Sequence, residues 1–112
     1  MQINFGKETR DVLIEHGYSV EDIDWIGNEN YQVPIINFFD RADAYDYDNG
    51  YGGERVPTDI ILVMNDGSYF SRYTYDGAEW WIHNKVPQKP KKKVRLKSFC
   101  KTYLPLLEEF VE

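Results

Sequence analysis

The sequence predicts an α+β fold in which an antiparallel β-meander of about three to five strands packs with two or three short helices. Two Asp-Gly pairs, at Asp66-Gly67 and Asp76-Gly77, lie ten residues apart between strand-forming runs, which is typical meander spacing. Helix-like apolar patterns occur on both sides of this region. The nine Tyr, six Phe and three Trp residues also favour an ordered core, because disordered chains are poor in aromatic residues.

The chain before the meander carries helix and strand signals in alternation. Val12, Leu13 and His16 share one helical face and Gly17 follows as a stop signal. The predicted elements, in chain order, are a helix over 7–16, a capped helical turn at 19–22, strands over 24–27 and 31–33, and a helix from Pro34 to about Ala44.

The meander itself consists of predicted strands at 58–64, 68–75 and 78–84. The first strand is apolar on both faces, so we expect it to be central and covered on both sides. The adjacent residues Trp80 and Trp81 must point to opposite faces of the third strand. We therefore expect one tryptophan in the core and the other exposed, unless a helix covers it.

The organisation predicted for residues 1–112 is one domain, with an acidic α+β body (1–84), a basic connection (85–97) and a C-terminal helix (98–112). The single cysteine, Cys100, excludes an internal disulfide. The N-terminus lacks the pattern of a signal peptide, and the longest apolar run is too short to span a bilayer. We expect a cytoplasmic protein that does not insert into membranes.

Charge is strongly segregated along the chain. Residues 1–84 hold five basic and sixteen acidic residues, a net charge of −11, whereas residues 85–112 hold eight basic and three acidic residues, a net charge of +5. Two opposite fields on one small protein predict that one of them meets a partner. The alternative is that the split serves solubility alone.

The first candidate for partner contact is a stretch rich in Asp, Tyr and Gly, predicted to be a loop over 45–53. A calcium loop is excluded because, counted from Asp46, Gly50 stands at position five and Pro57 at position twelve. Tyrosine is an efficient contact residue, and spaced carboxylates can imitate a phosphate backbone. A turn-rich loop without a binding role remains the alternative. The candidate partner-binding residues are Asp43, Tyr45, Asp46, Tyr47, Asp48, Tyr51 and Glu54.

The second candidate is the basic connection over 85–97, here called the basic run. It could hold a phosphate backbone while an exposed tryptophan stacks on bases. Its candidate contacts are Lys89, Lys91, Lys92, Lys93, Arg95 and Lys97. Two prolines and the absence of interleaved aromatics before Phe99 favour a solvated linker instead. The same run could also neutralise the acidic body, whose charge disfavours direct nucleic-acid binding.

No catalytic motif is present in the sequence. The two histidines, His16 and His83, have no cysteine or further histidine at metal-ligand spacing. No phosphate loop, dinucleotide fingerprint or nucleophile elbow occurs. A hydrolase using the acid pair Asp76 and Glu79 is a third hypothesis, although the turn already explains Asp76. We expect no catalytic residues, no metal and no cofactor.

Three segments resemble a family of small bacterial and phage proteins that carry YDxGYG and YDGxEWW motifs around a hydrophobic strand. They are 47–53 (YDNGYGG), 58–63 (TDIILV) and 75–81 (YDGAEWW), and the resemblance covers roughly residues 22–90. The resemblance implies no particular biochemical activity. Short acidic proteins of mobile elements are often inhibitors of host defence, including anti-CRISPR proteins. We therefore hypothesise a non-enzymatic inhibitor that occupies a basic surface of a protein partner, such as a CRISPR effector nuclease.

Overall fold

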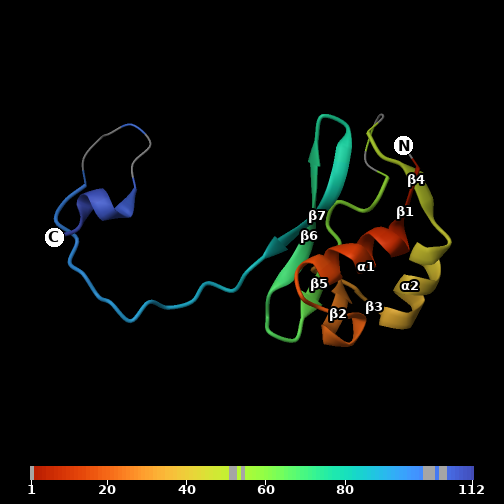
Figure 1. Ribbon diagram of the computed structural model, residues 1–112, viewed down its shortest axis with the longest axis horizontal. Helices are drawn as coiled ribbons and strands as arrows, with labels where there is room; N and C mark the ends of the chain where they lie inside the picture. The colour runs from red at the N-terminus through yellow and green to blue at the C-terminus, as the bar shows by residue number, and fades with distance from the viewer. Residues whose placement is uncertain (1, 51–52, 54, 100–102, 104–105) are drawn as a thin grey trace.

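The α+β fold predicted from the sequence is confirmed by the computed structural model, which describes residues 2–50, 53, 55–99, 103 and 106–112 (Figure 1). The described residues form two α-helices, a five-stranded antiparallel sheet and a separate two-stranded sheet. The elements are β1 (Gln2–Asn4), α1 (Phe5–Glu15), the 3-10 helix η1 (Val20–Asp22), β2 (Ile23–Gly27), β3 (Gln32–Val33), α2 (Ile35–Asp43), β4 (Asp46–Asp48), β5 (Ile61–Met64), β6 (Tyr69–Tyr75), β7 (Ala78–Asn84) and the 3-10 helix η2 (Leu107–Phe110).

The large sheet has the strand order β3-β2-β5-β6-β7, and each neighbouring pair is antiparallel. Strands β6 and β7 pair along their whole length, from Tyr69 opposite Asn84 to Tyr75 opposite Ala78. The turn between them has positive φ angles at both central residues, 51° at Asp76 and 84° at Gly77. This is the requirement of a type I′ hairpin turn, so the meander predicted from the Asp-Gly pairs is confirmed.

Helix α1 begins where Asn4 caps it, because the Asn4 side chain accepts a 2.9 Å hydrogen bond from the backbone N–H of Lys7. Its second residue, Gly6, lies against the end of α2. A Cβ atom at Gly6 would stand 1.9 Å from Oδ1 of Asp43, so the two helices can approach this closely only where α1 has no side chain.

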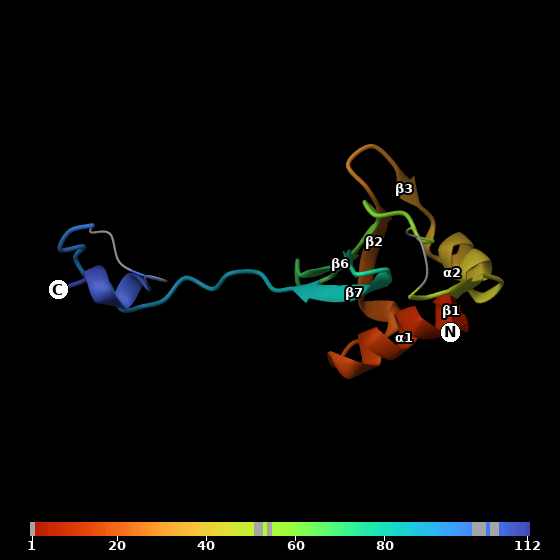
Figure 2. The same ribbon diagram turned by 90° about the horizontal axis from the view of Figure 1, so that it is seen from above.

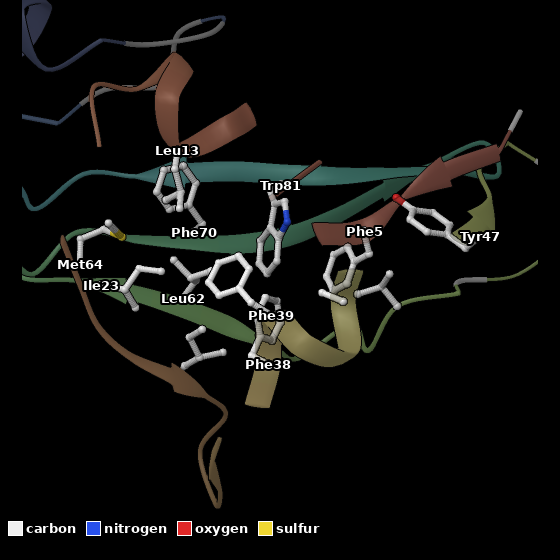
Figure 3. Packing of buried hydrophobic residues seen from close by; sticks show 13 residues of the cluster. Phe5, Leu13, Ile23, Phe38, Phe39, Tyr47, Leu62, Met64, Phe70 and Trp81 are labelled. Carbon is white, nitrogen blue, oxygen red and sulfur yellow. The ribbon is translucent and has the colours of Figure 1, made fainter. Parts of the chain in front are cut away.

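The core forms between the two α-helices and one face of the large sheet (Figures 2 and 3). The ring of Phe5 stacks on Trp81, with centroids 5.8 Å apart, and meets Phe38 edge-on at 5.6 Å. Trp81 also donates a 3.0 Å hydrogen bond from Nε1 to the buried hydroxyl of Thr9. The other face of β6 and β7 is exposed at its aromatic side chains, which are Tyr69, Tyr73, Tyr75 and Trp80.

Two predictions about the sheets need correction. Strand β5 is central as expected, but it begins at Ile61 and is not buried on both sides, since Ile61 and Val63 are only half-buried. The loop predicted over 45–53 is wrong at 46–48, where β4 pairs with β1. That pairing joins residues more than forty positions apart, so the local composition carried no signal for it.

The chain leaves the body at the end of β7 and extends away from it (Figure 1). The C-terminal helix predicted over 98–112 is wrong for the described residues, which form only the short η2; residues 100–102 and 104–105 lie outside the described part. Leu96 instead pairs with Val111 in an isolated antiparallel bridge. Its hydrogen bonds run from Lys97 N–H to the Phe110 carbonyl (2.6 Å) and from Glu112 N–H to the Arg95 carbonyl (3.0 Å).

Candidate binding surface

The acidic candidate residues gather where α2 ends and β4 begins (Figure 1). Asp40, Asp43, Tyr45 and Asp46 are exposed, and Asp48 is half-buried. We use the name acidic edge for four of the candidates from the sequence, Asp43, Tyr45, Asp46 and Asp48, together with Asp40 of α2, which was not among those candidates. Two further candidates from the sequence, Tyr51 and Glu54, lie outside the described residues.

Hydrogen bonds hold part of the acidic edge in place. The Asn4 side chain donates 2.9 Å hydrogen bonds to the backbone carbonyl of Asp43 and to Oδ1 of Asp46. The Arg10 guanidinium bonds to both carboxylate oxygens of Asp43. These hydrogen bonds hold the pKa of Asp43 below its usual range. Asp43 is therefore already neutralised by Arg10.

Tyr47 does not belong to the contact surface that the sequence predicted. Its side chain is 3% exposed, and its hydroxyl donates to Glu8 while accepting a 3.2 Å hydrogen bond from Arg72. Burial and the bond to Glu8 raise the pKa of this phenol. Tyr45 stacks on Tyr47 but remains exposed, and its hydroxyl donates to the Arg55 carbonyl at 2.6 Å. Tyr45 alone of these two can meet a partner.

Arg72 is the centre of a buried charged network. It donates to Glu8 at 3.0 Å and to Glu79 at 3.2 Å. The rings of Phe5 and Trp81 lie 5.2 Å and 5.0 Å from its guanidinium carbon, an arrangement that favours a cation. The network joins α1, β4, β6 and β7 and has a structural role.

Glu79 is fully engaged in this network. Besides Arg72, it accepts backbone hydrogen bonds from Arg55 (2.7 Å) and Val56 (3.2 Å), and it is 3% exposed. Asp76, its proposed catalytic companion, lies in the exposed turn between β6 and β7. Glu79 is thus a buried member of the Arg72 network, whereas Asp76 is an exposed residue of the hairpin turn.

A groove of about 600 Å³ lies between α1 and β7. It is lined by Gln2, Ile3, Asn4, Lys7, Glu8, Asp11, Val12, Glu15, His16, Trp80 and Trp81. Three carboxylates of α1 line this α1–β7 groove, of which Asp11 pairs with Lys7 at 2.6 Å and Glu8 with Arg72 at 3.0 Å. Glu15 has no cation partner among the described residues, so the groove keeps a net negative charge. No sequence pattern indicates this groove, because its walls are far apart in the chain.

A second group missed by the sequence reasoning surrounds Ser68. Its hydroxyl lies 2.6 Å from Asp66 and 3.0 Å from Nε2 of His83, and Tyr18 donates to Asp66 at 2.6 Å. Hydrogen bonds from Ser68 and Tyr18 lower the pKa of Asp66 to about 2. Burial lowers the pKa of His83. The carboxylate bonds to Ser68 and Tyr18 rather than to the imidazole, so it does not orient the histidine as a catalytic relay requires.

The candidate nucleic-acid contacts of the basic run are all exposed. They lie on the segment that leads away from the body, whereas Trp80, which is 37% exposed, packs beside Tyr73 at 5.3 Å between ring centroids. The structure does not bring the basic run and the exposed tryptophan together. Arg95 lies 3.5 Å from Glu112, within the same C-terminal part.

Comparisons with protein-family models, with curated proteins and with solved structures found no match. Within the described part of the chain, no group of three or more His, Cys, Asp or Glu side chains is arranged to hold a metal ion. No helix in that part is both long and apolar enough to cross a bilayer.

Proposed function

We propose that the protein is a non-enzymatic binding protein whose acidic edge occupies a basic surface of a protein partner. The supporting observation is which carboxylates the cations of the body pair with. Lys7, Arg10 and Arg72 form ion pairs with carboxylates of the body itself. Among the described residues no cation pairs with Asp40 or Asp46, and both are exposed.

The exposed ring of Tyr45 lies in sequence between these two carboxylates, and its hydroxyl is held by the Arg55 carbonyl. A rigid aromatic side chain beside unpaired carboxylates suits a protein interface, because it adds contact area at low entropy cost. The negative field would accelerate association with a basic surface and make it sensitive to salt.

The partner class that we propose is a nuclease of host defence, such as a CRISPR effector, and the protein would act as its inhibitor in a phage or other mobile element. Such a nuclease must carry a basic channel for its nucleic acid. Exposed carboxylates can occupy that channel in place of phosphates. The resemblance of residues 22–90 to small bacterial and phage proteins motivates this choice of class.

The test is an assay of DNA cleavage by a purified, guide-loaded CRISPR effector of the natural host, at low and high salt. The wild-type chain should inhibit cleavage, and Asp40→Asn with Asp46→Asn should weaken inhibition at least tenfold, since two contact charges are lost. The matched control is Asp24→Asn with Glu29→Gln, which removes two exposed charges elsewhere on the body. Equal inhibition by both double variants would reject the acidic edge as the contact.

The alternative function is a nucleic-acid-associated factor that uses the basic run, whose side chains are all exposed. Replacing Lys91, Lys92 and Lys93 by Gln would then abolish retention of RNA or DNA and reduce the salt dependence of binding. Under the inhibitor proposal the same triple variant retains full inhibition. The triple variant therefore distinguishes the two functions, because it loses activity if the protein binds nucleic acid and keeps it if the protein is an inhibitor.

A further inference from the structure

Strand β7 ends the large sheet and leaves part of its outer edge open. In an antiparallel ladder alternate residues direct their N–H and C=O groups to opposite sides. The outward pair of Glu79 is satisfied by the Asn49 side chain, at 2.9 Å and 3.0 Å. The same edge continues through Trp81 and His83, whose outward backbone groups have no hydrogen-bond partner among the described residues. An open edge of this kind is a template for another strand.

The C-terminal part contains a short strand with a complementary open edge. The bridge of Leu96 to Val111 uses the Arg95 carbonyl and the Lys97 N–H. By the same alternation, Val94 and Leu96 direct their backbone groups to the other side. The side chains also alternate, with apolar residues at 94 and 96 and basic residues at 93, 95 and 97. This period of two is that of a strand with two distinct faces.

The two faces of this segment match the two sides of the β7 edge. On one side lies the α1–β7 groove, where Glu8 pairs with Arg72, Asp11 pairs with Lys7, and Glu15 has no cation partner among the described residues. The basic face of 93–97 would meet Glu15 and the exposed carboxylate of Asp11 there. On the other side lies the exposed pair of Trp80 and Tyr73. The apolar face fits there, since the side chains of residues 94 and 96 are 44% and 45% exposed.

The course of the chain favours a second copy as the one that receives the segment. Pro87 and Pro90 fix their own φ angles and disfavour helical conformations in the residues before them. Residues 85–92 accordingly run away from the sheet, and the molecule is 55 Å long on its longest axis. Eight extended residues span roughly 26 Å, enough to reach a neighbouring molecule.

We propose that the protein forms a dimer in which residues 93–97 of each chain add as a strand to the β7 edge of the other. The exchange is reciprocal, so both copies bury the same surfaces around a twofold axis. This inference goes beyond the proposed function and does not depend on it, because the α1–β7 groove does not include Asp40, Tyr45 or Asp46.

The first experiment is sedimentation equilibrium of the nuclease-treated full chain over a range of concentrations. We expect a monomer–dimer equilibrium that weakens as salt is raised, because the groove and the segment attract through opposite charges. Lys93→Glu with Lys97→Glu should raise the dimer dissociation constant at least about tenfold. The matched control, Lys85→Glu with Lys89→Glu, makes the same charge change outside the exchanged strand and should leave the dimer intact.

A charge exchange identifies the pairing directly. Asp11→Lys with Glu15→Lys reverses exposed charges of the groove without touching Glu8, and it should also yield a monomer. Mixing this variant with Lys93→Glu, Lys97→Glu should restore a dimer that contains one chain of each kind, because each segment then faces a groove of opposite sign.

Three outcomes would overturn the proposal. They are a wild-type chain that stays monomeric at all concentrations, a dimer that is indifferent to both pairs of reversals, and a failure of the mixture to form the mixed dimer. A monomer whose Lys93 and Lys97 reversals expose the β7 amides to hydrogen exchange would show instead that the segment folds back on its own body. If the untreated chain associates but the nuclease-treated chain stays monomeric, the first of these outcomes holds and nucleic acid bridged the chains.

Discussion

Two regions of this molecule place their cations in contrasting environments, one buried and one exposed. Arg72 is enclosed in the body, with Glu8 and Glu79 as partners and two aromatic rings beside it. The lysines of the basic run are exposed on an extended segment. The same kind of charge is thus structural in the first region and free for association in the second. Burial makes the difference, because a desolvated charge must be paired, whereas a solvated charge contributes little to stability.

The largest effect on stability is expected from removal of the buried cation, Arg72. Arg72→Met should lower the free energy of unfolding by about 3–5 kcal/mol, because Glu8 and Glu79 would lose their counter-charge inside the body. Arg41→Met removes an exposed arginine and should change stability by less than about 0.5 kcal/mol. Urea unfolding followed by tryptophan fluorescence measures both. Equal effects would mean that the network around Arg72 is not what stabilises the body.

The next comparison uses the adjacent tryptophans of β7. Trp81→Ala should cost about 3–5 kcal/mol, because it removes a buried ring that packs against Phe5 and Arg72 and leaves a cavity. Trp80→Ala should cost about 1 kcal/mol or less at monomeric concentrations, since Trp80 is 37% exposed and its ring packs beside the exposed Tyr73. Thermal unfolding monitored by circular dichroism separates the two. A larger loss from Trp80 would place the core on the wrong face of the sheet.

A smaller effect is expected from Asp66, whose pKa is lowered to about 2 by its hydrogen bonds from Ser68 and Tyr18. A carboxylate with a lowered pKa in the folded state stabilises the protein above its unfolded pKa of about 4. That contribution is lost as the pH falls through 2. Asp66→Asn should therefore flatten the decline of the urea midpoint between pH 4 and pH 2. An unchanged slope would contradict the hydrogen bonding described for Asp66.

The smallest effect on folding is predicted for the exposed segment. Replacing Lys91, Lys92 and Lys93 by Gln should change the free energy of unfolding by less than about 0.5 kcal/mol, measured below the concentration at which the chain associates. A loss of more than about 1 kcal/mol would show that the basic run packs on the acidic body, contrary to its exposure in the structure.

Much of the fold could be predicted from local patterns. Several elements depend on residues that are close together in sequence. They are the helices α1 and α2, the capped turn at 19–22 and the type I′ turn at Asp76-Gly77. The alternation of β7 also predicted that one of Trp80 and Trp81 would be buried. The short strands β1 and β4 escaped prediction, because each is three residues long and is stabilised by the other from a distant part of the chain.

The candidate surface was predicted less well, and the acidic stretch shows the reason. Asp40, Asp46 and Tyr45 are exposed as a contact surface needs, but Tyr47 is buried and Asp43 is paired with Arg10. Composition identifies residue types that suit an interface. It does not reveal that Arg72, twenty-five positions further on, donates a hydrogen bond to Tyr47.

By itself, the sequence determined the fold class, the hairpin turns and the separation of negative body from positive tail, since each follows from local propensity or from counting charges. Tertiary structure alone decided which charges are buried, which strand edge remains open and which carboxylates line the α1–β7 groove. The physical reason is that desolvation and edge pairing depend on groups brought together from distant positions. No local pattern specifies which partners will meet.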